Sequence, residues 1–348
     1  MRNPIYETNL KHPSGLHFCR LFLSGLYARF SEAAGCACPE EETKIETYER
    51  MDKKEEWIKR WRSYGYLLLT LCLLAGAAHP AAAGTAGKDT VRILAIGNSF
   101  SQDAVEQYLH ELAEAEGFPT VIGNMFIGGC SLERHVNNSR TGAPAYAYRK
   151  IDVTGKKTET KGMTLEKALA DEHWDYVSLQ QASPFSGLYP TYEASLPELV
   201  AYVKARLPAH TRLVLHQTWA YAADATHTGF KNYDTDQLAM YRAIVEAVRK
   251  AARLTKIKII VPSGTAIQNA RTSFVGDRMN RDGYHLDVKI GRYTAACTWF
   301  ERIFGRSVLG NPYAPEGLDE ARRRVAQRAA HEAVAHPNRI TDLSRMEE

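Results

Sequence analysis

The sequence predicts an α/β protein in which a central parallel sheet of about five strands lies between two layers of helices. Short apolar segments recur along the chain from about residue 90, and most are followed by a segment with the 3.6-residue periodicity of an amphipathic helix. Strands that alternate with helices usually pair in parallel, because each helix carries the chain back to the start of the next strand. The 348 residues are enough for one such domain with appendages.

Each element follows from its local pattern. Five short apolar segments are the predicted strands: 91–97, 120–127, 174–180, 212–219 and 256–262. Five longer segments are the predicted helices: 103–117, 192–207, 234–254, 288–304 and 316–335, of which the last is polar and Arg-rich. We expect the domain to span 84–313, and the Arg-rich helix after it, within 314–348, to be peripheral. Alternation around Gly155 predicts an inserted hairpin at about 146–163, over one end of the sheet.

The segment before the domain has the three parts of an export signal. Basic residues precede an apolar run, Tyr66 to Ala78, and small residues follow it. The run has 13 residues, fewer than the roughly 20 that span a bilayer. We therefore expect 51–83 to be a cleaved signal peptide that directs the protein to the periplasm or the extracellular space, with no stable membrane insertion after cleavage; an uncleaved anchor is the alternative. Because Met51 is a plausible start, we expect 1–50 to be a disordered upstream extension that is not made in the cell.

Composition and cysteine content exclude several functional classes. The net charge is only +4 and no basic stripe is interleaved with aromatic residues, so nucleic acid is not an expected partner. No Cys/His cluster has the spacing of a metal site, and no glycine-rich phosphate loop follows a strand, so we expect neither a metal nor another cofactor. Cys130 and Cys297, the two cysteines after residue 90, form either one disulfide or two buried thiols, and buried thiols are favoured.

Three residues have the chemistry of a catalytic triad. Ser99, in ILAIGNSFSQ, lies at the expected turn from the first strand into a helix, where free N–H groups favour negative charge, although serine also caps helices routinely. Asp282 and His285, in MNRDGYHLD, share one loop before a predicted helix. A serine nucleophile needs a base, and the base needs an acceptor that fixes its tautomer. Together the three residues predict a Ser–His–Asp triad.

The joint pattern resembles the SGNH (GDSL-like) hydrolase family over about residues 91–305. The motif G-x-S follows the first predicted strand, two glycines follow the second strand, and two side-chain amides follow the third strand. The motif D-x-x-H precedes the last helix of the domain. The segments SGTAIQNAR and RDGYHLDVKIGRYTAACTWFE resemble a secreted branch of that family from gut and environmental Bacteroidetes. The general α/β-hydrolase pattern G-x-S-x-G is not matched, since Ser101 holds its fifth position. The resemblance implies a flavodoxin-like α/β/α sandwich. In the implied acyl-enzyme mechanism, Ser99 attacks an ester carbonyl, His285 is general base and then acid, and Asp282 orients His285.

The resemblance also implies an oxyanion hole formed by the backbone N–H groups of Ser99 and Gly129 and by a side-chain amide. Two departures from the family pattern concern this region. Asn98 replaces the usual Asp between the glycine and the serine, and VSLQQASPF has no Asn where the family has G-x-N-D. Gln181 is preferred to Gln180 as the replacement donor; a hydrogen-bonded strand end is the alternative for both glutamines.

Polar and aromatic side chains near the same edge of the sheet are candidates for substrate contact. They are Asn98, Gln180, Trp219, Tyr221, Asn269 and Arg271. Aromatic rings there stack on sugars, although each taken singly more often packs under a loop. Export and polar loops favour a carbohydrate esterase that removes acyl groups, acetyl above all, from carbohydrate or another small ester. The alternatives are a lipase or thioesterase of the same fold, for which we find no apolar lid, and a non-catalytic glycan-binding protein on a decayed hydrolase fold.

Overall fold

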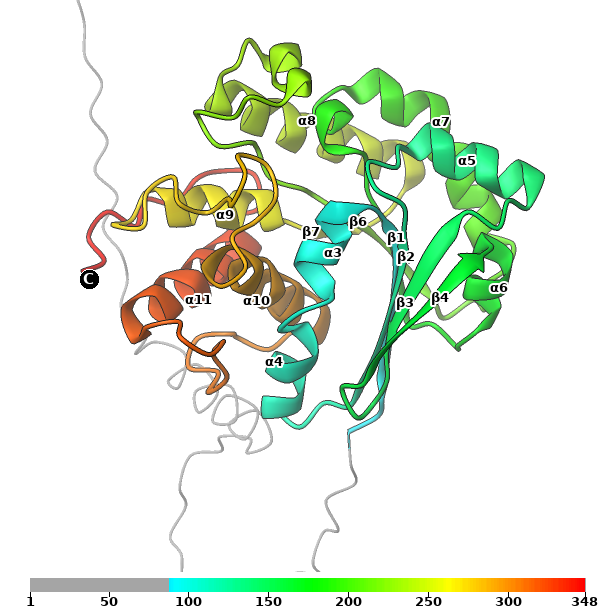
Figure 1. The fold of residues 1–348 in the computed structure, drawn as a ribbon, viewed down its shortest axis with the longest axis horizontal. Helices are drawn as coiled ribbons and strands as arrows, with labels where there is room; N and C mark the ends of the chain where they lie inside the picture. Colours follow the sequence, from blue (N-terminus) through cyan, green and yellow to red (C-terminus); the bar gives the residue numbers. More distant parts are fainter. Residues whose placement is uncertain (1–87, 348) are drawn as a thin grey trace, which may run out of the picture. The chain divides into compact units, whose positions relative to one another are not determined.

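A seven-stranded sheet forms the centre of the computed structural model, which describes residues 88–347 (Figure 1). Its strands are β1 (Val91–Gly97), β2 (Thr120–Phe126), β3 (Tyr146–Ile151), β4 (Lys157–Met163), β5 (Tyr176–Leu179), β6 (Arg212–His216) and β7 (Ile259–Val261). Their spatial order is β4-β3-β2-β1-β5-β6-β7. The strands β1, β2, β5, β6 and β7 pair in parallel, whereas β3 and β4 are antiparallel.

Helices cover both faces of this sheet, so the predicted three-layer α/β/α class is confirmed (Figure 1). One face carries α3 (Ser99–Val105), α4 (Leu109–Ala115) and α10 (Ile290–Phe304). The other carries α5 (Leu132–Thr141), α6 (Leu165–Ala170), α7 (Tyr189–Lys204) and α8 (Gln237–Thr255). Helices α9 (Ser263–Arg271) and α11 (Glu320–Ala335) pack on each other and on α10. Two 3-10 helices, Ser183–Phe185 and Thr228–Tyr233, lie in loops after β5 and β6.

Several elements differ from the sequence expectation, which did not include the helices α5, α6 and α9. The helix predicted at 103–117 is two short helices, because Asn98 caps a helix that already begins at Ser99 and because Tyr108 adopts a left-handed conformation with φ of 70°. The hairpin forms around Gly155 as predicted, but it does not cover an end of the sheet. It adds two antiparallel strands to one edge of the sheet, because β3 pairs with β2.

The C-terminal helix is more firmly attached than a peripheral helix. Its inner face is buried against α9 and α10, and small side chains allow that close approach: Val325, Ala326, Gln327, Ala329, Ala330 and Ala333. Its opposite face, with the arginines, is largely exposed or half-buried. The predicted signal peptide and the predicted extension at 1–50 lie outside the described residues.

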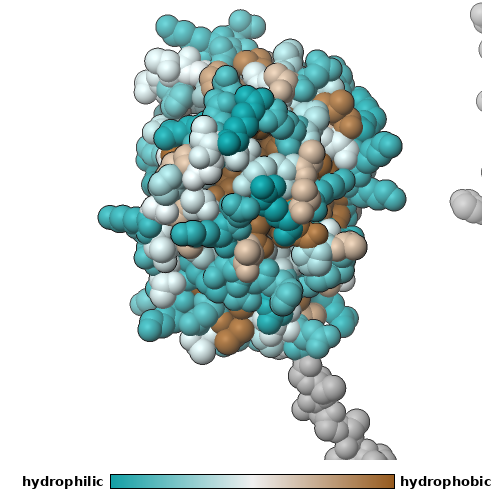
Figure 2. Space-filling view, turned by 90° about the vertical axis from the view of Figure 1, so that its right-hand side faces the viewer, coloured by the Kyte–Doolittle hydropathy of each residue, from teal (hydrophilic) through white to brown (hydrophobic). Residues whose placement is uncertain are grey.

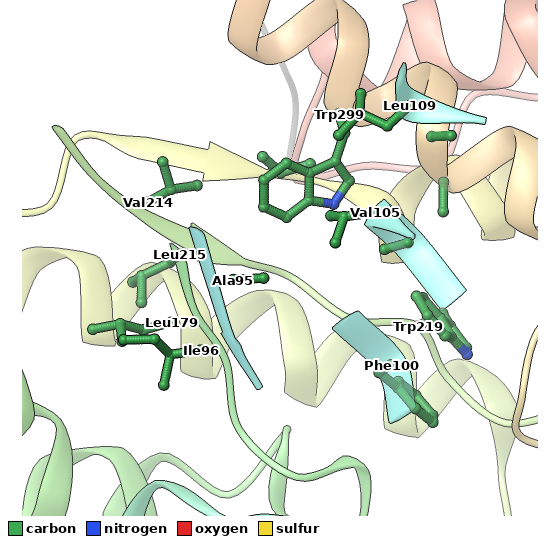
Figure 3. Packing of buried hydrophobic residues seen from close by; sticks show 14 of the residues in the cluster. Ala95, Ile96, Phe100, Val105, Leu109, Leu179, Val214, Leu215, Trp219 and Trp299 are labelled. Carbon is green, nitrogen blue, oxygen red and sulfur yellow. The ribbon is translucent and has the colours of Figure 1, made fainter. Parts of the chain in front are cut away.

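The hydrophobic core lies on both faces of the sheet and reaches the carboxyl ends of its strands. Figure 3 shows side chains of β1, β5 and β6 beside Trp299, with Phe100 and Trp219 lying parallel to each other. These last two rings are stacked 4.3 Å apart. Cys130 and Cys297 are buried and unpaired, as expected.

The surface is mixed in polarity. On the face drawn in Figure 2, hydrophobic residues are scattered among hydrophilic ones instead of forming one broad patch. Among residues 88–347, no helix combines the length and the apolar character needed to cross a membrane.

Candidate active site

Ser99 is the first residue of α3 and is partly exposed at the carboxyl end of β1. Asn98 Oδ1 accepts the backbone N–H of Phe100 at 2.9 Å and thereby caps the helix. The turn needs glycine at position 97, because a Cβ there would lie 2.5 Å from the Oγ of Ser101. The local sequence thus places a serine hydroxyl at a tight, well-defined turn.

Asp282 and His285 form a hydrogen-bonded pair in the loop between α9 and α10. His285 Nδ1 lies 2.7 Å from Asp282 Oδ2, and Asp282 Oδ1 accepts the backbone N–H groups of His285 at 2.7 Å and Tyr284 at 3.2 Å. Partial burial opposes the negative charge of Asp282, but these hydrogen bonds outweigh burial and hold the pKa of its carboxyl below the ordinary value. Because Nδ1 donates to the carboxylate, the free lone pair of the neutral ring is on Nε2.

The segments that carry Ser99 and His285 meet through Phe100, and the two residues make no direct hydrogen bond. The ring of Phe100, the residue after Ser99, lies 6.0 Å from the ring of His285, centroid to centroid. Within the described part of the chain, Ser99 Oγ makes no hydrogen bond. Catalytic hydrogen bonds are often longer without substrate, so the serine–histidine step belongs to the proposal below.

The glycine loop after β2 presents free backbone donors. Gly128 and Gly129 are exposed, and Gly129 has a φ of 61°, which glycine adopts without strain. No group in residues 88–347 accepts the Gly129 N–H. Asn98 Nδ2 donates to the Cys130 carbonyl at 3.0 Å and so ties this loop to the end of β1.

Asn98 and Gln180 belong to a buried network and not to a substrate surface. Gln180 Nε2 donates to Asn98 Oδ1 at 2.9 Å, and Gln180 Oε1 lies 2.8 Å from His216 Nδ1. His216 Nε2 is 3.0 Å from Ser263 Oγ. Burial lowers the pKa of His216 to about 3, so this ring is neutral at physiological pH and is no base. Since Asn98 and Gln180 are also buried, the structure does not support their expected contact with substrate.

The side chain of Gln181, the expected oxyanion donor, is bonded mainly to neighbouring segments of the protein. Its Oε1 accepts the backbone N–H groups of Leu132 at 2.9 Å and Ala182 at 2.8 Å, and its Nε2 donates to Thr191 Oγ1 at 2.9 Å. The side chain therefore joins the starts of α5 and α7, and only one of its two amide protons lacks a partner among the described residues.

The other four expected substrate contacts, Trp219, Tyr221, Asn269 and Arg271, are also buried. Trp219 donates through Nε1 to the Tyr284 carbonyl at 2.8 Å, and the Tyr221 hydroxyl lies 2.8 Å from Ser183 Oγ. Both aromatic rings are inaccessible to solvent. The structure therefore does not support direct stacking of a sugar on either ring.

Asn269 and Arg271 hold distant segments together. Asn269 bonds the Ala329 carbonyl and the Thr341 N–H, so it attaches the C-terminal segment to α9. Buried Arg271 pairs with Asp277 at 2.8 Å and donates to Asn280. Burial is the main reason that the pKa of Arg271 falls to about 10, against the raising effect of Asp277. Neither residue is placed to contact substrate.

Sequence reasoning missed two residues beside the base. His227 and Tyr284 are half-buried, and the ring of Tyr284 lies 4.2 Å from that of His285 and 4.9 Å from that of His227. Burial, and next the charge of His285, lower the pKa of His227. No motif marked His227, because its position depends on the packing of the loop after β6 against the Asp282 loop.

A cavity of about 550 Å³ opens next to Gln181, between α5 and α7. Its walls combine apolar, hydroxyl and charged groups: Ser131, Glu133, Val136, Asn137, Arg140, Gln181, Phe185, Pro190, Thr191, Ala194 and Ser195. Phe185 is 40% exposed, which is unusual for an aromatic side chain in this molecule. The volume lies within the range of small-molecule sites, about 300–1,000 Å³.

Fold and site together define an α/β/α protein with a serine after the first strand and an Asp–His pair at the same edge of the sheet. The chain belongs to the DUF4886 family, described as a domain of unknown function, whose model matches residues 92–333. A DUF4886 family protein from Bacteroides uniformis, known from a crystal structure, is 66% identical. The match covers 74% of this chain and 100% of that one, with a TM-score of 0.74.

Weaker similarities reach further solved structures. A candidate SGNH hydrolase from Slackia heliotrinireducens is 24% identical, over 62% of this chain and 100% of that chain, with a TM-score of 0.43. An acetylxylan esterase from Geobacillus stearothermophilus is 14% identical, over 62% of this chain and 95% of that chain, with a TM-score of 0.42. No curated protein matches the chain.

Proposed function

We propose that this protein is an exported serine esterase of the SGNH type that removes acyl groups, acetyl above all, from carbohydrate. The observation that carries the proposal is the 2.7 Å contact of His285 Nδ1 with Asp282 Oδ2, at the edge of the sheet where Ser99 begins α3. This contact leaves Nε2 of His285 as a proton acceptor, and a partly exposed serine hydroxyl is the nucleophile that such a base activates.

The proposed reaction has two steps. Ser99 Oγ attacks the ester carbonyl while His285 Nε2 takes its proton, and Asp282 stabilises the resulting imidazolium. The N–H groups of Ser99 and Gly129 stabilise the oxyanion; donors of this kind are worth about 3–4 kcal/mol each. The imidazolium then protonates the sugar oxygen as its bond to the carbonyl carbon breaks, which releases the sugar alcohol and leaves an acyl-serine. Water, deprotonated by His285, attacks that ester; the bond to Ser99 Oγ breaks, the imidazolium returns the proton to Oγ, and the acid is released.

The carbohydrate part of the proposal is supported by the cavity between α5 and α7. Its lining includes Ser131, which follows Gly129 by two residues in the chain, and Gln181. Hydroxyl, amide and charged groups beside an exposed aromatic ring, Phe185, suit a sugar better than a long acyl chain, which needs a continuous apolar wall.

One observation favours a second candidate, a glycan-binding protein without activity. Gln181 occupies the position at which the SGNH pattern has Asn. Its side-chain oxygen already accepts hydrogen bonds from two backbone N–H groups. Labelling with a fluorophosphonate separates the two candidates, because an activated serine reacts with this reagent and a pure binding protein does not.

The decisive experiment removes the nucleophile and the base. We expect Ser99→Ala and His285→Ala to lower turnover by many orders of magnitude, on the order of 10⁶, while the protein stays folded. Release of acetate from acetylated sugars and hydrolysis of 4-nitrophenyl acetate measure this, with the melting temperature as the folding control. Wild-type rates in Ser99→Ala would refute the nucleophile; an inert wild type that binds glycans would favour the second candidate.

A further inference from the structure

Both backbone groups next to His285 in the chain are held by buried side chains. On one side, the carbonyl of Tyr284 accepts the indole N–H of Trp219 at 2.8 Å. On the other side, the N–H of Leu286 donates to Asp103 Oδ2 at 2.8 Å. The peptide groups on either side of His285 are thus held by Trp219 and Asp103 in addition to the hydrogen bonds from Asp282.

Both of these side chains are attached to the helix that begins at Ser99. Asp103 lies one turn after Ser99 on α3. Trp219 stacks on Phe100, the residue after Ser99, with 4.3 Å between the ring centroids and 6° between the planes (Figure 3). The base loop, residues 272–289 between α9 and α10, is far from Ser99 in the sequence, and these two contacts connect it to α3. Within the loop, Asn280 Nδ2 also donates to the Tyr284 carbonyl at 3.1 Å.

The contact at Asp103 is reinforced by charge. Its carboxylate is fully buried and pairs with Arg292 on α10 at 2.6 Å and with Arg281 of the base loop at 3.2 Å. Arg281 also donates to the Leu286 carbonyl. A buried carboxylate is tolerated only when its oxygens are satisfied in this way, and breaking such a group is strongly destabilising. A shift of the base loop along α3 would therefore separate Arg281 from the buried carboxylate of Asp103.

We propose that Asp103 and Trp219 are positioning residues that hold His285 at the distance from Ser99 that proton transfer requires. This inference rests on the proposed esterase function. Because a displacement of about 1 Å can lower a rate about 100-fold, loss of either contact lowers turnover and serine reactivity far more than it changes substrate binding.

Trp219→Phe tests the inference most directly, because phenylalanine keeps an aromatic ring beside Phe100 and removes the indole N–H, together with a loss of ring volume that the control variant shares. The matched control is Trp174→Phe, since Trp174 is equally buried and donates to the Ala168 carbonyl at 2.9 Å, away from the site. We expect similar losses of melting temperature in both variants. Only Trp219→Phe should lower kcat and the fluorophosphonate labelling rate, by about 10- to 100-fold with KM nearly unchanged.

A second test compares the variant Asp103→Asn with Glu106→Gln as its matched control. Glu106 is also a buried carboxylate at α3, but it pairs with Arg149 at 3.4 Å and with Lys157 on the hairpin. Again only the Asp103 variant should lower kcat and labelling. If Asp103→Asn does not fold, the tryptophan pair decides the question.

A third readout does not depend on activity. The proton on His285 Nδ1 should give an NMR signal shifted downfield by Asp282; we expect Trp219→Phe to weaken it and Trp174→Phe to leave it intact. Equal behaviour of the two tryptophan variants in turnover, labelling and this signal would overturn the inference. A wild type that neither hydrolyses esters nor is labelled would instead refute the proposed function, and the NMR comparison would still decide the inference.

Discussion

At the scale of single residues, Asp282 shows how one carboxylate orients a reactive histidine. One oxygen accepts the ring of His285, and the other accepts two backbone N–H groups of the same loop. The loop thus folds around its own carboxylate. Such an orienter also stabilises the fold, because its charged form is bonded only in the folded state.

The stability contribution of Asp282 should depend on pH. Its pKa is lower in the folded protein than the ordinary 3.8, so the contribution is present above that value and disappears as the pH falls through the lower folded pKa. We expect Asp282→Asn to lower the melting temperature at about pH 6 and to approach wild type near pH 2. Thermal unfolding of both proteins across this range measures the difference; a constant difference at every pH would contradict the linkage.

At the scale of elements, the turn from β1 into α3 is set by close packing. A Cβ on residue 97 would meet Ser101 Oγ at 2.5 Å, and that hydroxyl is held by the Asn98 carbonyl and by Asn124. The clash falls on a bonded, buried group that has no room to move aside. The geometry of the nucleophile therefore depends on a residue that takes no part in the chemistry.

Gly97→Ala should accordingly lower both stability and turnover. Overpacking of this kind costs about 1–3 kcal/mol, and the displaced turn also shifts Ser99. Urea unfolding and acetate release measure the two effects. Adding Ser101→Ala should recover part of the stability, because it removes the nearer of the two clashing atoms; no loss in the single variant would show that the turn accommodates a side chain.

The cavity between α5 and α7 predicts a separate effect on substrate binding. Phe185→Ala should raise KM for an acetylated sugar about 2- to 12-fold with little change in kcat, since loss of a ring contact removes roughly 0.5–1.5 kcal/mol. Leu254→Ala is the matched control, because Leu254 is 41% exposed, close to the 40% of Phe185, and lies outside the cavity. Equal KM values in the two variants would exclude the cavity as the sugar site.

At the scale of the whole molecule, Thr85–Glu348 form a compact unit of their own. Within it, the C-terminal helix and the segment after it are attached to α9 by buried contacts, including those of Asn269 with Ala329 and Thr341. The C-terminal segment is therefore part of the domain, and its removal would expose the small-residue face of α11 and its partners.

Cleavage of the expected signal peptide at 51–83 stays a prediction from the sequence. We predict that the exported protein begins at Gly84 and that a chain starting there has the same specific activity as the full chain. Mass spectrometry of the periplasmic or secreted protein determines its first residue. A mature protein that still contains 51–83 would refute cleavage.

The sequence by itself determined the α/β/α class, the five parallel strands and the pairing of Asp282 with His285, for a shared physical reason. Apolar periodicity is a local property, and an Asp three residues before a His in one tight loop can reach its ring whatever the rest of the chain does. The same holds for Ser99 at its turn, where Asn98 and Gly97 act on immediate neighbours.

Only the tertiary structure decided which polar and aromatic side chains face a ligand. Asn98, Gln180, Trp219 and Arg271 were all expected at the substrate surface, but each is buried and bonded to a segment distant in the sequence. A buried polar group must find a partner, and that partner depends on how loops far apart in the chain pack together. For the same reason Asp103, which no motif singled out, became visible only when α3 and the loop of His285 were in place.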